Sequence, residues 1–170
     1  GRGSLYEGAV RVVALAVWPG HLEPAVVSER IHVTDMYPTL LNRAGAPLDS
    51  TQQIKPIDGI DAWEVIAGGK PSKRDEMLIH VDEFRGAVMV GNWKLVVYAT
   101  LPSRVELYNV ADDPSEEDNL AEREPERVQQ LLSRLNNYAW EMAPSMYLDD
   151  LAGARSHETP IFWGENPQRP

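Results

Sequence analysis

Four short apolar runs follow one another between residues 77 and 110, and they constrain the fold more than any other feature of the chain. They are Met77–Val81, Gly86–Val90, Trp93–Ala99 and Val105–Val110. The pair Gly91-Asn92 separates the second run from the third, and pairs of this type are typical of tight hairpin turns. The simplest arrangement of these runs is a small four-stranded antiparallel meander.

The following segment predicts a long C-terminal helix over residues 126–142. Pro125 stands at its start, where the missing N–H of proline costs little. Apolar residues then recur at helical spacing on one face: Val128, Leu131, Leu132, Leu135, Tyr138, Ala139 and Met142. An apolar stripe of this kind favours burial, so we expect the helix to pack across the sheet and the fold to be α+β.

The first part of the chain has a different character. Residues 9–17 read AVRVVALAV, a nearly continuous apolar run that predicts a strand covered on both faces, as in a parallel sheet. Asp35 can accept a hydrogen bond from the amide of Tyr37, which predicts a helix over residues 35–44. A short helix is expected over residues 61–67, before a glycine pair.

Length and composition limit the classes of function. The 170 residues suit one domain and carry a formal net charge of −10, which disfavours nucleic acid and anionic membranes as partners. The absence of cysteine excludes disulfides, thiolate metal sites and a cysteine nucleophile. No apolar run approaches the roughly 20 residues that span a bilayer.

Six pieces of the sequence, taken in order, resemble the C-terminal third of the sulfatase family, most closely its arylsulfatase B-like branch in the alkaline phosphatase-like superfamily. They are RGSLYEGAVRV…WPG, HVTDMYPTLLNRAG, IDGIDAW, VGNWKLVV, ELYNVADDPSEEDNLA and the helix that follows. The resemblance implies that residues 1–69 are a remnant of a larger α/β catalytic domain, to which strand 9–17 and helix 35–44 belong. It implies a C-terminal sulfatase subdomain over residues 70–142 and an extended Pro/Trp tail over residues 143–170.

The resemblance also implies a missing catalytic centre. Family members cleave sulfate esters with a formylglycine made from Cys or Ser in a C/S-x-P-x-R motif, and they hold a divalent metal, usually calcium, through acidic residues. This sequence contains no such motif. We therefore expect no cofactor in this chain and no sulfatase activity from the chain alone.

Two residues are candidates for a substrate site. Arg2 matches the family's sulfate-contacting lysine, and a guanidinium can also hold an oxyanion. The alternative is a solvated terminal arginine. His80 resembles a histidine near the rim of the family's substrate pocket, and the alternative is a strand histidine that is simply hydrogen-bonded.

Other polar and aromatic residues receive structural interpretations. Asp58, Asp82 and Glu83 lack the spacing of a calcium loop and are expected in solvated turns. Trp93 and Lys94 are expected in the core and at the surface, respectively. The tryptophans at 63, 140 and 163 are expected to be packing anchors.

Two main functions remain open at this point. The chain is either the inactive C-terminal portion of a sulfatase or a noncatalytic binding or assembly module that keeps this fold; a hydrolase that uses the histidines and carboxylates is a third. The partner is expected to be a second copy, contacted through residues 5–45, or an N-terminal catalytic domain. The sequence assigns no compartment, although complete family members are often periplasmic, secreted or lysosomal.

Overall fold

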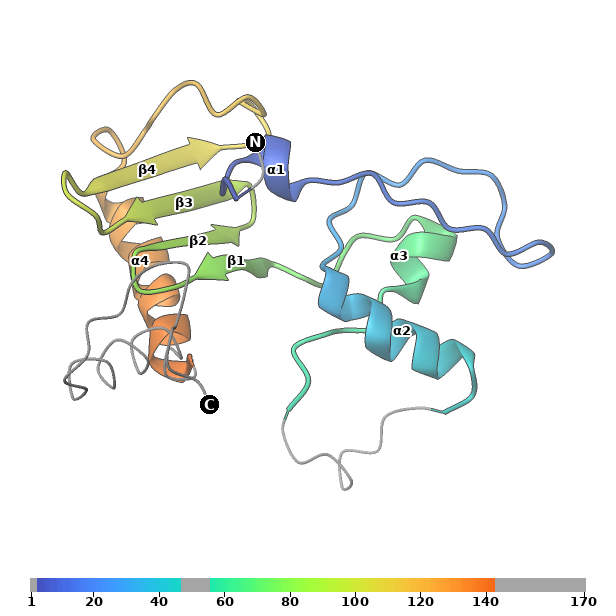
Figure 1. Ribbon diagram of the computed structural model, residues 1–170. Helices are drawn as coiled ribbons and strands as arrows, with labels where there is room; N and C mark the ends of the chain where they lie inside the picture. Colours follow the sequence, from blue (N-terminus) through green and yellow to red (C-terminus); the bar gives the residue numbers. More distant parts are fainter. Residues whose placement is uncertain (1–2, 47–55, 143–170) are drawn as a thin grey trace, which may run out of the picture.

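The computed structural model describes residues 3–46 and 56–142, and its centre is a four-stranded antiparallel sheet in the order β1-β2-β3-β4 (Figure 1). The strands are β1 (Glu76–Val81), β2 (Arg85–Val90), β3 (Trp93–Tyr98) and β4 (Arg104–Asn109). Each begins and ends within one residue of a predicted strand. The predicted meander is therefore confirmed.

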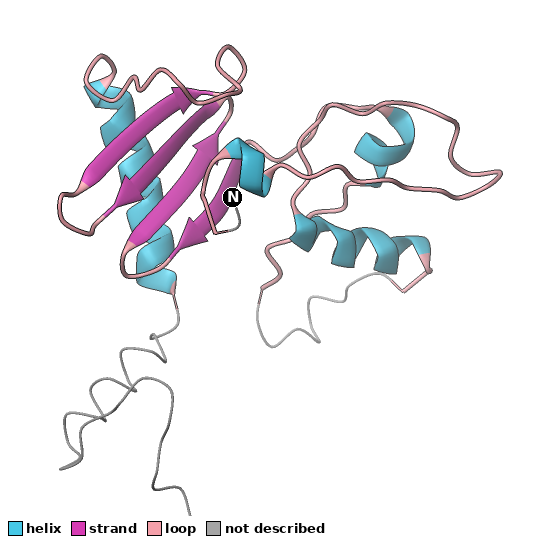
Figure 2. Ribbon diagram, turned by 45° about the horizontal axis from the view of Figure 1, so that its top comes forward, coloured by secondary structure: helices cyan, strands magenta, loops and turns pink. Residues whose placement is uncertain are grey.

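One face of the sheet is covered by the long helix α4 (Pro125–Glu141), which crosses behind the strands in Figures 1 and 2. The buried residues at this contact are Val88, Leu95, Leu107, Leu131 and Leu135. The three strand residues stand side by side in the sheet register, so they present one continuous apolar surface to the helix. This packing confirms the predicted α+β fold.

The opposite face of the sheet is covered by the N-terminal segment, which includes the short helix α1 (Glu7–Val10). Leu5 is buried against Ala87 and Val96 of the two central strands. Because both faces are covered, β2 and β3 are buried along most of their length. This explains why the sequence of β3 is apolar at consecutive positions instead of alternating.

The predicted strand over residues 9–17 is wrong. Residues 7–10 form α1, and residues 11–17 follow as irregular extended chain without any strand partner in the described ranges. Val13 and Leu15 are 91% and 92% exposed. A parallel strand needs neighbouring strands to satisfy its backbone groups and cover its side chains, and the described residues supply none.

Three short helical elements form a second part of the fold, beside the sheet (Figure 1). They are the 3-10 helix η1 (Val33–Asp35), α2 (Met36–Arg43) and α3 (Trp63–Gly68). Both predicted helices are thus present, with ends that differ by one or two residues. The predicted cap is wrong, since the side chain of Asp35 makes no capping bond to α2.

Asp35 instead joins three segments of the chain. Its buried carboxylate accepts hydrogen bonds from the amides of His32 and Ile60, both at 2.9 Å, and from Arg74. Burial alone would raise the pKa of Asp35, but the bonds from Arg74 and the two amides lower it below its usual value. These donors engage both carboxylate oxygens, so the side chain does not cap α2.

Gly59 allows these segments to approach each other. A Cβ at this position would lie 2.1 Å from the carbonyl oxygen of Thr34. The guanidinium of Arg74, which binds Asp35, also donates to the carbonyl of Asp58. The Asp-Gly pair therefore serves a close backbone contact at Gly59, while Asp58 is exposed to solvent, as expected.

Tryptophan packing only partly follows the sequence. Trp63 of α3 lies edge-on to Trp18, with ring centroids 5.5 Å apart, and is an anchor as expected. Trp140 is 88% exposed and anchors nothing in the described part of the chain. The expected tail over residues 143–170, which includes Trp163, lies outside the described residues. Among residues 3–46 and 56–142, no helix combines the length and apolarity needed to cross a bilayer.

Replacing Gly59 by alanine should destabilise the protein by about 1–3 kcal/mol, because the new methyl group overlaps backbone that has no room to move. The matched control is Gly68→Ala, whose Cβ would meet only Lys70 at 3.9 Å. The free energy of unfolding, measured by urea titration, should fall for the first variant only. Equal values for the two variants would show that the contact at Thr34 is not tight.

Candidate functional site

Two site residues were predicted from the sequence, and the structure describes one of them, His80. It lies near the end of β1 in a small polar cluster. Its Nε2 is 2.8 Å from Oδ2 of Asp82, and its side chain is 37% exposed. The same oxygen accepts from Nε of Arg85 at 3.3 Å. The other oxygen of Asp82 accepts from the amides of Phe84 and Arg85, both at 2.8 Å. Asp82 thus lies in the turn between β1 and β2, as expected, and its carboxylate organises that turn.

Arg85 connects this cluster to the start of the chain. Its Nη1 donates to the carbonyl oxygen of Gly3 at 2.5 Å. Arg2, the other predicted site residue, lies outside the described residues. Gly3, the residue that follows Arg2, is therefore hydrogen-bonded to the turn that carries Asp82, the partner of His80.

Asp82 is charged over a wide pH range. Burial alone would raise the pKa of its carboxyl, but hydrogen bonds from His80, from the two turn amides and from Arg85 lower it to about 2. A carboxylate that stays ionised above this pKa keeps accepting the hydrogen bonds of the imidazole and the guanidinium. The cluster is therefore a stable, preorganised polar site at the end of the sheet.

A second polar cluster lies beneath α1 and contains a fully buried ammonium. Lys94 of β3 has an exposed fraction of 0%, and its Nζ lies 3.0 Å from Glu7 Oε1 and 2.8 Å from Glu116 Oε1. The second distance is that of an ion pair without the alignment of a hydrogen bond. Glu116 also accepts from the amide of Glu7 at 2.5 Å. The expected surface position of Lys94 is therefore wrong. The two carboxylates explain how it can be buried, because a buried ammonium is stable only with such partners.

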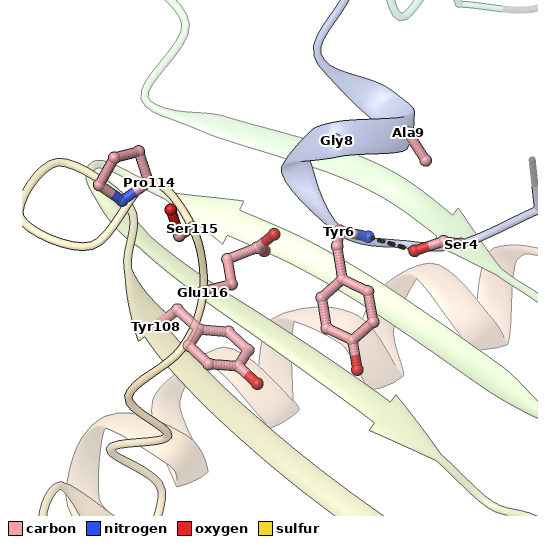
Figure 3. A pocket seen from close by; sticks show the side chains of 8 residues that line it. All are labelled: Ser4, Tyr6, Gly8, Ala9, Tyr108, Pro114, Ser115 and Glu116. Atoms are coloured by element: carbon pink, nitrogen blue, oxygen red, sulfur yellow. Dashed lines mark hydrogen bonds between the residues drawn. The ribbon is translucent and has the colours of Figure 1, made fainter. Parts of the chain in front are cut away.

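A hollow of about 550 Å³ adjoins this cluster (Figure 3). The rings of Tyr6 and Tyr108 and the carboxylate of Glu116 line it. Tyr6 donates to Glu106 Oε2 at 2.6 Å. Burial and the charge of Glu106 raise the pKa of Tyr108 to about 12 and raise that of Tyr6 further, with a hydrogen bond to Glu106 adding to both shifts. Both phenols therefore stay protonated, and that of Tyr6 acts as a hydrogen-bond donor.

The residues of the described ranges do not fit the divalent metal that the sulfatase resemblance implies. Within residues 3–46 and 56–142, no three His, Asp or Glu side chains converge in a metal-binding group. The acidic run from Asp112 to Asp118 forms a turn in which Asp113 accepts from the amides of Glu117 and Asp118. Its carboxylate is occupied by backbone N–H groups, as a structural turn requires.

Sequence reasoning missed Lys94, Glu116 and Arg85. For Lys94 a signal was available: Leu95, Val96 and Val97 follow it without alternation, so β3 had to be buried on both faces and its lysine with it. Glu116 carries no such signal, because it lies in a turn with a backbone φ of 57° and meets Lys94, 22 residues before it, only in the folded chain. Arg85 matters through Gly3, which is 82 residues away in the chain.

The sheet, the long helix α4 and the N-terminal segment that packs on the sheet define a small α+β domain. The family described as N-sulphoglucosamine sulphohydrolase, C-terminal, matches residues 2–142. The chain belongs to this family and is a sulfatase C-terminal domain. The resemblance to the C-terminal region of the sulfatase family is therefore confirmed.

Individual relatives agree with this assignment. The chain is 40% identical to human arylsulfatase A over 99 residues, which cover 55% of this chain and 19% of that protein. It is 27% identical to arylsulfatase J of Mus musculus, over 86% of this chain and 32% of that protein. The chain thus spans a third or less of the length of these relatives.

A solved structure supports the fold. The candidate sulfatase yidJ of Bacteroides fragilis superimposes with a TM-score of 0.53 at 21% identity, covering 71% of this chain and 27% of that one. At this level of identity the comparison concerns the fold alone.

Replacing Lys94 by methionine should lower the free energy of unfolding by about 3–5 kcal/mol, because it leaves two buried carboxylates without their cation. Methionine keeps the length of the aliphatic stem, so the loss reports on charge and not on volume. The control is Lys70→Met, which removes an ion pair whose partners are about 60% exposed. The expectation fails if urea titration gives values within about 0.5 kcal/mol of each other for the two variants.

Proposed function

We propose that this chain is the C-terminal portion of a sulfuric ester hydrolase and that the formylglycine nucleophile and the metal ligands belong to a separate N-terminal catalytic domain. The observation that carries the proposal is the family match over residues 2–142, combined with the absence of a C/S-x-P-x-R motif from the sequence. The short coverage of the relatives, 19% of arylsulfatase A and 32% of arylsulfatase J, is consistent with it.

The chemistry explains why the chain alone should be inactive. Cleavage of a sulfate ester requires a strong nucleophile, a Lewis acid on the sulfuryl oxygens and an acid for the leaving group, all held within reach of one another. His80, the most exposed member of the Asp82 cluster, offers a hydrogen-bonding group but no activated nucleophile. The residues of this chain can hold and orient a substrate but cannot replace the missing assembly.

Within a complete enzyme, we assign substrate-side roles to Arg2 and His80. Arg2 would contact the sulfate through its guanidinium, since it matches the sulfate-contacting position of the family. His80 would lie at the rim of the substrate pocket. The hydrogen bond from Arg85 to Gly3 ties the described residue that follows Arg2 in the sequence to the His80 cluster.

The exposed apolar surface of the chain indicates where a partner protein binds. Val12, Val13, Leu15 and Val17 are each at least 78% exposed. On the first turns of α2, Tyr37 and Leu40 are also more than half exposed. Water penalises such surface at roughly 25 cal/mol per Å². We therefore expect residues 5–45 to bind the catalytic domain or, in its absence, a second copy of this chain.

A noncatalytic module is the second candidate. It is favoured by the sheet, which is covered on both faces by residues of this same chain, so that the subdomain has a core of its own. The two candidates differ in the DNA upstream of the coding segment. An open frame that encodes C/S-x-P-x-R supports the sulfatase portion, and a stop codon supports the module.

The isolated chain should not hydrolyse para-nitrophenyl sulfate in the presence of calcium, because it has no residue that can become formylglycine in the family's motif. The release of nitrophenol should equal that of buffer, and a complete arylsulfatase serves as the positive control. Turnover that co-purifies with the chain would overturn the proposal that the nucleophile lies elsewhere.

The isolated chain should form a dimer or larger assembly in light scattering. Leu15→Lys should shift the assembly toward monomer, because it places a charge in the exposed apolar segment. Leu101→Lys is the matched control, since Leu101 is 95% exposed but lies outside residues 5–45. A monomeric wild-type chain, or an equal effect of both substitutions, counts against this surface.

A further inference from the structure

The hydrogen bond between His80 and Asp82 fixes which nitrogen of the imidazole carries the proton. A carboxylate has acceptors only, so Nε2, at 2.8 Å from Oδ2 of Asp82, must be the N–H donor. Nδ1 has no hydrogen-bond partner among the described residues. A neutral His80 therefore offers the lone pair of Nδ1, and a protonated one offers an N–H there.

The same carboxylate also fixes the position of Arg85. Nε of Arg85 donates to Oδ2, and the backbone amide of Arg85 donates to Oδ1. The guanidinium is thereby extended toward Gly3, whose carbonyl oxygen it binds at 2.5 Å. Two residues further on, Leu5 is only 4% exposed and packs on Ala87 and Val96. The backbone at Gly3 is thus held from one side by a charged donor and anchored by a buried side chain.

We propose that Asp82 and Arg85 are positioning residues, which hold the imidazole of His80 and the backbone at Gly3 in one fixed arrangement. This inference rests on the proposed function, in which His80 faces the substrate. Asp82 selects the imidazole tautomer, so that Nδ1 is the nitrogen presented to a substrate hydroxyl or, after protonation, to an anionic oxygen. Arg85 is held by the Asp82 carboxylate and in turn holds the carbonyl of Gly3 in the N-terminal segment.

Substitutions at Asp82 and at Arg85 should have different effects, because the two residues make different contacts. Asp82 contacts His80 directly, whereas Arg85 contacts Asp82 and Gly3 but makes no bond to the imidazole. A change at Arg85 should therefore release Gly3 and leave the tautomer intact. A change at Asp82 should affect both, because it removes the anchor of the guanidinium as well as the partner of the imidazole.

Nuclear magnetic resonance of the full chain tests this directly. In wild-type protein at a pH where imidazole is neutral, long-range proton–nitrogen spectra should show the Nε2–H tautomer of His80 favoured by about tenfold or more. In Asp82→Asn that preference should be lost, because asparagine has one acceptor oxygen where Asp82 uses two. In Arg85→Lys the tautomer should be retained, while the heteronuclear NOE of Gly3 falls in both variants.

The control is Arg123→Gln, which removes an arginine of an exposed pair with Asp118 and should leave both signals unchanged. Unaltered amide shifts in β3 and β4 establish that each variant is folded. The inference is overturned if Asp82→Asn keeps the wild-type tautomer, or if Gly3 is as ordered in Arg85→Lys as in wild type. Neither signal depends on turnover, so a failure of the sulfatase proposal in the aryl sulfate assay is distinguishable from a failure of this one.

Discussion

The buried ammonium of Lys94 is the interaction on which the arrangement of this domain depends. A lysine with no exposed surface requires compensating charge, and Glu7 and Glu116 supply it from segments on either side of the central sheet in sequence. Meeting that requirement draws α1 and the acidic turn onto the same face of β3. The turn accepts a left-handed backbone at Glu116 as part of this arrangement. The hydrophobic contact of Leu5 and the polar contact of Tyr6 with Glu106 then complete the cover.

The chain has one part whose apolar side chains are buried by its own residues and another part whose apolar side chains stay exposed. The sheet has α4 on one face and the N-terminal segment on the other, and its core is closed within residues 3–10 and 76–141. Immediately after α1 the chain leaves the sheet as an exposed apolar segment, although residues 11–17 are as apolar as a buried strand.

Local patterns in the sequence predicted the sheet and α4, because hairpin turns and an apolar stripe are specified by neighbouring residues. They failed where the outcome depends on distant partners. Strand 9–17 was expected from its composition, but a strand forms only beside other strands. Asp35 was expected to cap its own helix, yet it binds Arg74, 39 residues away, and Lys94 was expected at the surface but pairs with Glu7, 87 residues away. Of the candidate site, His80 was predicted from the family resemblance, whereas the contacts of Asp82 and Arg85 follow only from the fold.

We propose that this chain completes a sulfatase catalytic domain through its exposed apolar segment, residues 11–17. Amide hydrogen exchange of residues 11–17 tests it most directly, measured in the isolated chain under monomeric conditions and in a protein that joins the chain to such a catalytic domain. The account predicts fast exchange in the isolated chain and strong protection in the joined protein, with the amides of β2 and β3 protected in both. Equally fast exchange of residues 11–17 in the joined protein would contradict it.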